Sequence, residues 1–178
     1  MHVVIENAFS TAECAAIRAL APERMDEATL WNGTEYGVNH ASRRGALAAI
    51  ERRSAGEWLF ARVDMLFAAA ADRLGVEAAP MREALQLLRY DENCHFQQWH
   101  SDAGLDAIDR RFLSASIELS APDDYAGGDL EIVPFLMGPR RRGLGSAQVF
   151  HSRLLHRVTP VTSGTRWALV AWTGAAAG

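Results

Sequence analysis

Beyond Pro80 the sequence breaks into short segments of strand-forming residues, separated by clusters of residues that favour turns. Two such clusters are residues 123–128 (DDYAGG) and 143–146 (GLGS). The expected strands are Gln86–Tyr90, Phe96–Asp102, Phe112–Ser120, Asp129–Val133, Ala147–Phe150 and Trp167–Trp172. Many short strands after a helix-rich start favour a mostly β fold with supporting N-terminal helices, as in a β-sandwich or jelly roll.

The first eighty or so residues carry helix signals. Ser10–Glu13 has the pattern of a capping box, and an amphipathic helix is expected to continue from it until Pro22. A longer helix is expected from about Gly56 to Leu74. A strand is expected at His2–Glu6 and a hairpin at Leu30–Tyr36. We therefore expect one domain over residues 1–178, helix-rich over about 1–80 and forming a β core over about 81–174.

Composition excludes several classes of protein. A net charge of -4 gives no basic footprint for nucleic acid. The N-terminus shows no signal peptide, and no apolar stretch approaches the ~20 residues of a membrane helix. Cys14 and Cys94 are expected to be reduced thiols. These features predict a cytoplasmic protein without a membrane partner, and nothing in them indicates its oligomeric state.

The segment Trp99-His100-Ser101-Asp102 contains residue types that bind metals. Side chains two apart on a strand point the same way, so His100 and Asp102 are expected to share a face. A second imidazole, from His156 on a remote strand, would complete a 2-His-1-carboxylate set, which binds Fe(II) and leaves coordination positions open. Taken alone, the H-x-D pair is weak evidence for a metal site, because such a pair is often a surface strand end or a turn.

Arg166 follows His156 by ten residues, after a Ser163-Gly164 turn. A hairpin between Val161 and Arg166 would bring the guanidinium near His156, where its planar fork suits a dicarboxylate. His151 competes with His156 as the distal ligand. His95 has the wrong parity to share a face with His100, so it is expected to face away.

Six segments from about Gln86 to Trp172 resemble, in order, the prolyl-4-hydroxylase-like branch of the 2-oxoglutarate- and Fe(II)-dependent oxygenases. They are Leu88–Tyr90, Trp99–Asp102, Arg111–Ser114, Tyr125–Glu131, Val149–Phe150 with Leu155–Val161, and Gly164–Trp167. The resemblance implies a double-stranded β-helix (jelly roll). Asn93 and Ile132 depart from residues common in the family, glycine and phenylalanine respectively, which puts substrate shape in doubt more than the chemistry.

The resemblance also implies a role for each candidate residue. The implied metal ligands are His100, Asp102 and His156; the implied cosubstrate-binding residues are Tyr90, Ser114 and Arg166; and Trp172 is implied at the pocket wall. Arg166 would pair with the distal carboxylate of 2-oxoglutarate, and Ser114 would lie near that same carboxylate.

The expected function is that of a dioxygenase that uses Fe(II), 2-oxoglutarate and O₂. It would hydroxylate an unactivated C–H bond of a small molecule, an amino acid or a peptidyl, for example prolyl, substrate, and release succinate and CO₂. Ascorbate is a candidate stimulant. Two alternatives stay open: a non-catalytic sensor that binds 2-oxoglutarate or metal on the same fold, and a cupin-like metal enzyme that does not use 2-oxoglutarate.

Overall fold

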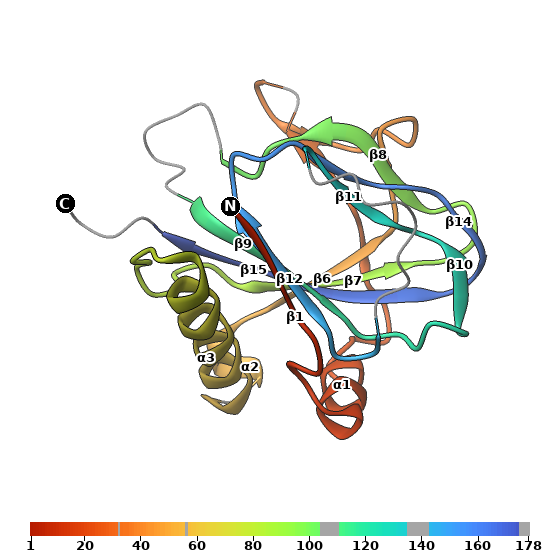
Figure 1. The fold of residues 1–178 in the computed structure, drawn as a ribbon. Helices are drawn as coiled ribbons and strands as arrows, with labels where there is room; N and C mark the ends of the chain where they lie inside the picture. The colour runs from red at the N-terminus through yellow and green to blue at the C-terminus, as the bar shows by residue number, and fades with distance from the viewer. Residues whose placement is uncertain (32, 56, 104–110, 135–142, 175–178) are drawn as a thin grey trace.

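The computed structural model describes residues 1–178 except 32, 56, 104–110, 135–142 and 175–178. Its largest element is a seven-stranded sheet in the order β1-β12-β9-β15-β7-β6-β2, with antiparallel neighbours throughout (Figure 1). These strands are β1 (His2–Ile5), β2 (Asp26–Glu27), β6 (Ala46–Ile50), β7 (Leu85–Tyr90), β9 (Arg111–Glu118), β12 (Ala147–His151) and β15 (Arg166–Gly174).

A smaller four-stranded sheet in the order β11-β13-β8-β5 faces the large one (Figure 1). Its strands are β5 (Arg43–Arg44), β8 (His95–His100), β11 (Leu130–Ile132) and β13 (His156–Val158). Two further pairs are β10 (Tyr125–Gly127) with β14 (Val161–Gly164), and the hairpin β3 (Leu30–Trp31) with β4 (Tyr36–Gly37). Two facing sheets of antiparallel strands form the jelly roll that the sequence predicts.

Helices α1 (Thr11–Arg18), α2 (Arg52–Ala55) and α3 (Glu57–Leu74) lie on the side of the large sheet away from the small one (Figure 1). Their apolar residues, including Ile17, Leu59 and Phe67, join one buried cluster with Leu87 and Ile117 of the sheet. Burying these side chains contributes the hydrophobic stabilisation of the fold. The helices thus support the large sheet from one face and leave its other face for the space between the sheets.

Several local predictions are confirmed. Ser10 and Glu13 form both hydrogen bonds of the capping box at the start of α1. The Leu30–Tyr36 region forms the hairpin β3–β4, and α3 ends at Leu74, followed by Gly75 with a φ of 65°. Helix α1 ends at Arg18, however, one turn earlier than the expected stop at Pro22.

One prediction about strands is wrong, and one strand was missed. Residues 161–166 do not form a hairpin, because β14 pairs with β10 whereas β15 pairs with β7 and β9. Gly164, with a φ of 74°, lies where the chain passes from the β10–β14 pair into the large sheet. Strand β6 was not expected, because its sequence Ala46–Ile50 contains three alanines and alanine favours helices. It nevertheless pairs with β7 inside the large sheet.

Strands from the first eighty residues thus lie within the sheet that carries the later strands, β1 against β12 and β6 against β7. We propose on this basis that the chain forms one domain. Among the described residues, no helix has the length and apolar character needed to cross a membrane.

Candidate metal centre and pocket

A cavity of about 1030 Å³ lies between the two sheets. The large sheet contributes alternate residues of β7 and β15 to its wall, including Tyr90, Arg166 and Trp172, and the small sheet contributes His100 and His156. Because side chains alternate along a strand, one face of the large sheet lines this cavity while the other packs against the helices. The cavity is at the upper end of the range usual for small-molecule sites.

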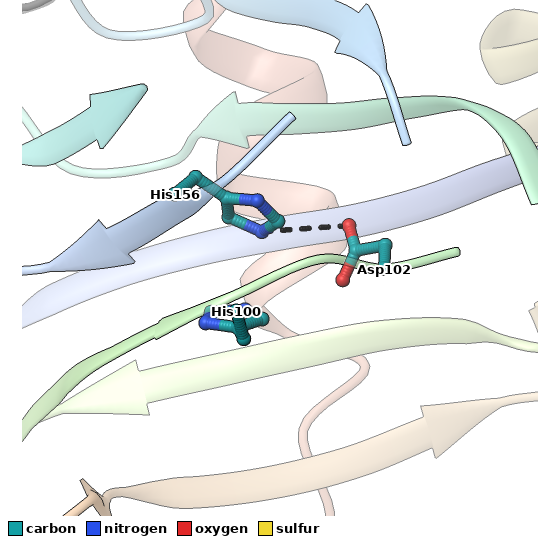
Figure 2. A group of neighbouring side chains, drawn as sticks. All are labelled: His100, Asp102 and His156. Carbon is teal, nitrogen blue, oxygen red and sulfur yellow. Dashed lines mark ion pairs between the residues drawn. The ribbon is translucent and has the colours of Figure 1, made fainter. Parts of the chain in front are cut away.

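The structure brings His156 together with His100 and Asp102, from which it is remote in the sequence (Figure 2). One ligand atom from each lies within 4.8 Å of the others. His100 and His156 are direct partners across the β8–β13 pair, so the register of the small sheet places the two rings side by side. Their ring centroids are 4.2 Å apart.

Backbone hydrogen bonds orient both imidazoles. The Nδ1 atom of His100 lies 2.9 Å from the carbonyl oxygen of Gln98, and that of His156 lies 2.9 Å from the carbonyl oxygen of Leu154. A carbonyl can only accept, so each Nδ1 carries a hydrogen, and Nε2 is the ring nitrogen that can bind a metal. Phe96 stacks on His100 with centroids 3.6 Å apart, which fixes the plane of that ring.

Asp102 lies just beyond the end of β8, rather than within the strand as predicted. Its backbone N–H donates to the carbonyl oxygen of Ser152 at 2.9 Å, so a turn from the other sheet holds it in place. Ser114 Oγ donates to Asp102 Oδ2 at 2.7 Å, and Asp102 Oδ2 is 3.5 Å from His156 Nε2. The carboxylate therefore has one oxygen hydrogen-bonded to Ser114 and faces the two imidazoles (Figure 2).

Burial and neighbouring groups set the protonation of this cluster. Burial, followed by the charge of His156, lowers the pKa of His100 to about 4, so its imidazole is neutral near pH 7. Burial alone would raise the pKa of Asp102, but His156, Trp172 and Ser114 together lower it below its ordinary value. A neutral imidazole and an ionised carboxylate are the forms that bind a metal ion. The donor set suits Fe(II) with open coordination positions.

Arg166, at the start of β15, points into the same cavity and is buried. Its Nε–H donates to Glu118 Oε2 of β9 at 2.9 Å, and its Cζ lies 5.8 Å from the centre of the Tyr90 ring. Gly128 leaves room for this side chain, since a Cβ there would come within 3.1 Å of Arg166 Cδ. Sequence reasoning missed Glu118, although a charged residue in a central strand requires a partner.

The remaining expected pocket residues take different positions. Tyr90 and Trp172 line the cavity and are buried. Ser114 contacts Asp102 and Ser152 Oγ, whereas the expectation placed it beside the distal carboxylate of the cosubstrate. Ser114 lies beside the metal-binding cluster because its partner across the β9–β15 pair is Trp172 and not Arg166.

Arg43 is a second residue that sequence reasoning did not assign to the site. It lines the cavity, its guanidinium lies 4.7 Å from the centre of the Phe96 ring, and its Nη1 donates to the carbonyl oxygen of Thr29. Its Nε is buried without a hydrogen-bond partner. An arginine N–H in this state can donate to an acceptor on a bound molecule.

The two other histidines considered from the sequence lie outside the cluster. His151 packs edge-on against Phe112 and accepts a hydrogen bond from the backbone of Arg153. His95 is buried on β8, five residues before His100. Neither belongs to the group of converging ligand atoms found among the described residues.

A jelly roll with two histidines and a carboxylate converging beside a buried arginine is the architecture of an iron-dependent oxygenase. The family model of the 2OG-Fe(II) oxygenase superfamily matches residues 85–174. A PKHD-type hydroxylase of Shewanella sp. strain MR-7 is 30% identical over 97% of this chain and 77% of that protein. A PKHD-type hydroxylase of Hyphomonas neptunium is 46% identical over 38% of this chain and 30% of its own length.

Solved structures share the fold at lower identity. A viral collagen prolyl hydroxylase from Paramecium bursaria Chlorella virus-1, in complex with 2-oxoglutarate, has a TM-score of 0.73 and 18% identity over 98% of this chain and 96% of that one. A prolyl-4-hydroxylase of Pseudomonas putida has a TM-score of 0.71 and 20% identity over 99% of this chain and 93% of that one. The chain belongs to the 2OG-Fe(II) oxygenase superfamily. It is an oxidoreductase that uses Fe(II) and 2-oxoglutarate.

Proposed function

We propose that this protein hydroxylates a C–H bond of a small-molecule, amino-acid or peptidyl substrate, and converts 2-oxoglutarate to succinate and CO₂. The observation that carries the proposal is the convergence of His100, Asp102 and His156 in a cavity that also contains Arg166. Bound Fe(II) would supply the activation of O₂ at this centre. The protein's own residues bind, orient and shield the reacting molecules.

Each residue of the cavity takes a role from its position. His100, Asp102 and His156 would hold the metal through their imidazole nitrogens and one carboxylate oxygen. Arg166 binds the distal carboxylate of 2-oxoglutarate, and the Tyr90 ring forms the wall beside it. Trp172 closes the wall near Asp102, opposite Ser114 on the neighbouring strand.

The size of the cavity supports a second bound molecule. At about 1030 Å³ it exceeds what one five-carbon cosubstrate fills. One part of the cavity is bounded by Leu30, Tyr36 and Arg43. A substrate with a carboxylate or carbonyl oxygen facing Arg43 fits this surface. A prolyl hydroxylase of Trichoplax adhaerens that shares the fold was solved with a peptide fragment, which supports including peptides in the search.

The experiment is a substrate screen with the Fe(II)-loaded protein. Succinate formation from 2-oxoglutarate is measured with ascorbate present, over amino acids, small carboxylates and prolyl peptides, and mass spectrometry detects an added oxygen atom. We expect one class to stimulate succinate formation and to gain one oxygen, and ascorbate to raise turnover. Binding of 2-oxoglutarate without any substrate-stimulated turnover would instead favour a sensor, and metal-dependent activity unchanged by Arg166→Ala would favour a cupin-like enzyme.

A further inference from the structure

Arg166 already has a counter-ion within its own chain. Its side chain is 4% exposed and that of Glu118 is 6% exposed, and the pair is joined by the 2.9 Å bond from Nε to Oε2. Glu118 extends from the central strand β9 on the same face as Ser114, and its neighbour across the strand pair is Ala168 of β15. The pair therefore belongs to the face of the large sheet that lines the cavity.

The groups packed around Glu118 add no second positive charge. Tyr125 of β10 faces the pair, and burial together with Glu118 raises the pKa of its phenol to about 12. Cys14 of α1 lies on the other side of the sheet, and burial raises the pKa of its thiol to about 11. The backbone N–H of Ser120 donates weakly to Glu118 at 3.4 Å. Tyr90 of β7 faces Arg166. With the phenol and the thiol neutral, the pair has a net charge near zero.

Binding of 2-oxoglutarate changes this charge balance. The step rests on the proposed function, in which Arg166 binds the distal carboxylate through its remaining N–H groups. Two carboxylates would then share one buried guanidinium, and like charges confined to one site strongly favour protonation of one of them. Burial already raises the pKa of Glu118 above its ordinary value, although Arg166 opposes the shift.

We propose that Glu118 takes up one proton from solvent when 2-oxoglutarate binds, so that the affinity for the cosubstrate falls as the pH rises. The new O–H bond forms on Glu118, and its other oxygen keeps accepting the hydrogen bond from Arg166 Nε. The guanidinium, which stays charged, then forms its ion pair with the distal carboxylate in place of Glu118. Glu118 acts as a positioning residue that sets how tightly the dicarboxylate is held.

The direction in which the 2-oxoglutarate affinity changes with pH follows from the linkage between proton binding and ligand binding. Below the pKa of Glu118 in the unliganded protein the proton is already present, so the affinity is independent of pH. Between that pKa and the higher pKa of Glu118 in the liganded protein, each binding event takes up as much as one proton, and the dissociation constant rises by up to about tenfold per pH unit.

The test is anaerobic isothermal titration calorimetry of the Fe(II)-loaded protein with 2-oxoglutarate, between about pH 6 and about pH 9. Titration in two buffers of different ionisation enthalpy gives the number of protons taken up. We expect uptake that approaches one proton as the pH rises. The probe 2-oxopentanoate has the same keto acid but a methyl group in place of the distal carboxylate, and it should bind with no uptake at Glu118.

The matched variants are Glu118→Gln and Glu131→Gln. Glu118→Gln keeps the shape and the acceptor for Arg166 but cannot titrate, so 2-oxoglutarate should bind it more tightly at high pH and without proton uptake. Because its arginine lacks a counter-ion, this variant should also gain more thermal stability from 2-oxoglutarate than the wild type does. Glu131 pairs with Arg157 at 2.7 Å and is absent from the cavity wall, so Glu131→Gln should behave as wild type.

Proton uptake that is absent in the wild type, or unchanged in Glu118→Gln, overturns the proposal and leaves the proposed function intact. Failure of 2-oxoglutarate to bind either protein at any pH overturns the proposed function itself. If Glu118→Gln does not fold, the comparison of 2-oxoglutarate with 2-oxopentanoate in the wild type decides, and equal uptake for both ligands contradicts the role of Glu118.

Discussion

The metal-binding cluster (His100, Asp102 and His156) and the part of the cavity around Arg166 and Tyr90, here called the arginine pocket, lie in the same cavity. Their charged groups are stabilised in different ways. At the cluster, the carboxylate of Asp102 and two imidazoles converge, and their fixed partners are hydroxyl and backbone groups. At the arginine pocket, Arg166 meets the full charge of Glu118. The cluster thus offers an ionised carboxylate to a cation, whereas the arginine pocket is nearly neutral before an anion enters.

This difference matters because a buried charge is costly unless it is paired. Asp102 is stabilised by the hydroxyl of Ser114 and by nearby imidazoles, which leaves its charge available to a metal ion. Arg166 is instead paired with a charged group, the carboxylate of Glu118. Substitutions at the two regions should therefore affect metal binding and cosubstrate binding separately.

The largest expected effect is at the metal-binding cluster. His156→Ala removes one of three ligands and should lower succinate formation by more than about 100-fold, since loss even of an outer partner of a ligand costs 10–100-fold. Fe(II) binding, measured anaerobically by equilibrium dialysis, should weaken in parallel. His151→Ala is the matched control, because that histidine contacts Phe112 outside the cluster and should leave both quantities near wild type. The reverse result would assign the distal ligand to His151.

The next effect is at the arginine pocket. Arg166→Met should raise the dissociation constant for 2-oxoglutarate by about 100-fold, because two charged hydrogen bonds are each worth roughly 1.5 kcal/mol or more. Fe(II) affinity should stay within a few-fold of wild type. Arg62→Met is the control, because Arg62 pairs with Glu13 on the helix-covered face of the sheet. Equal losses of Fe(II) and 2-oxoglutarate binding in Arg166→Met would show that the two regions are not separable.

Much of the metal-binding cluster could be predicted from the sequence, because the spacing of ligand-type residues and their order along the chain are local properties. The pair His100 and Asp102 was predicted from strand alternation, although Asp102 lies past the end of β8. The partner His156 came from the order of the motifs. What joins them, the direct pairing of His100 with His156, depends on the register of a sheet whose strands are far apart in sequence.

The arginine pocket could be predicted only in part. Residues 113–120 (LSASIELS) alternate strictly between apolar and polar, which already indicates one face toward a core and one toward a polar space. Glu118 lies on that polar face and could have been found there. Its partner could not, because the expected hairpin at 161–166 does not form and the contact arises from the pairing of β9 with β15. The same pairing placed Ser114 opposite Trp172 instead of beside Arg166.

A smaller effect is expected from removing the hydroxyl that supports Asp102. Ser114→Ala deletes the 2.7 Å hydrogen bond to Asp102 Oδ2 and should weaken Fe(II) binding by about tenfold, the usual loss for an outer partner of a metal ligand. Affinity for 2-oxoglutarate in the metal-loaded protein should change little. Ser116→Ala is the matched control, since Ser116 lies on the same face of β9 and lines the cavity. A selective loss of 2-oxoglutarate binding in Ser114→Ala would restore the role that the family resemblance implies.

The smallest effect is expected at Trp172. Its Nε1 is buried and has no partner of good hydrogen-bond geometry, yet it interacts with Asp102 and lowers the pKa of that carboxyl. Trp172→Phe keeps an aromatic ring against Arg111, whose Cζ lies 3.9 Å from the ring centre, and removes only the N–H. Fe(II) affinity should fall by less than about threefold, because an imperfect hydrogen bond contributes well under the ~1 kcal/mol of a good one.

The same Trp172→Phe protein tests whether the indole N–H acts on the metal ligand or on the substrate. If it acts on Asp102 alone, combining Trp172→Phe with Ser114→Ala should give more than the sum of the two losses in Fe(II) binding, because the carboxylate then loses both neighbouring side-chain donors. Simple additivity in Fe(II) binding, with a loss confined to substrate-stimulated turnover, would place the N–H among the substrate contacts. The double-mutant cycle thus shows how far neutral donors, rather than a charged partner, hold Asp102 ready for the metal.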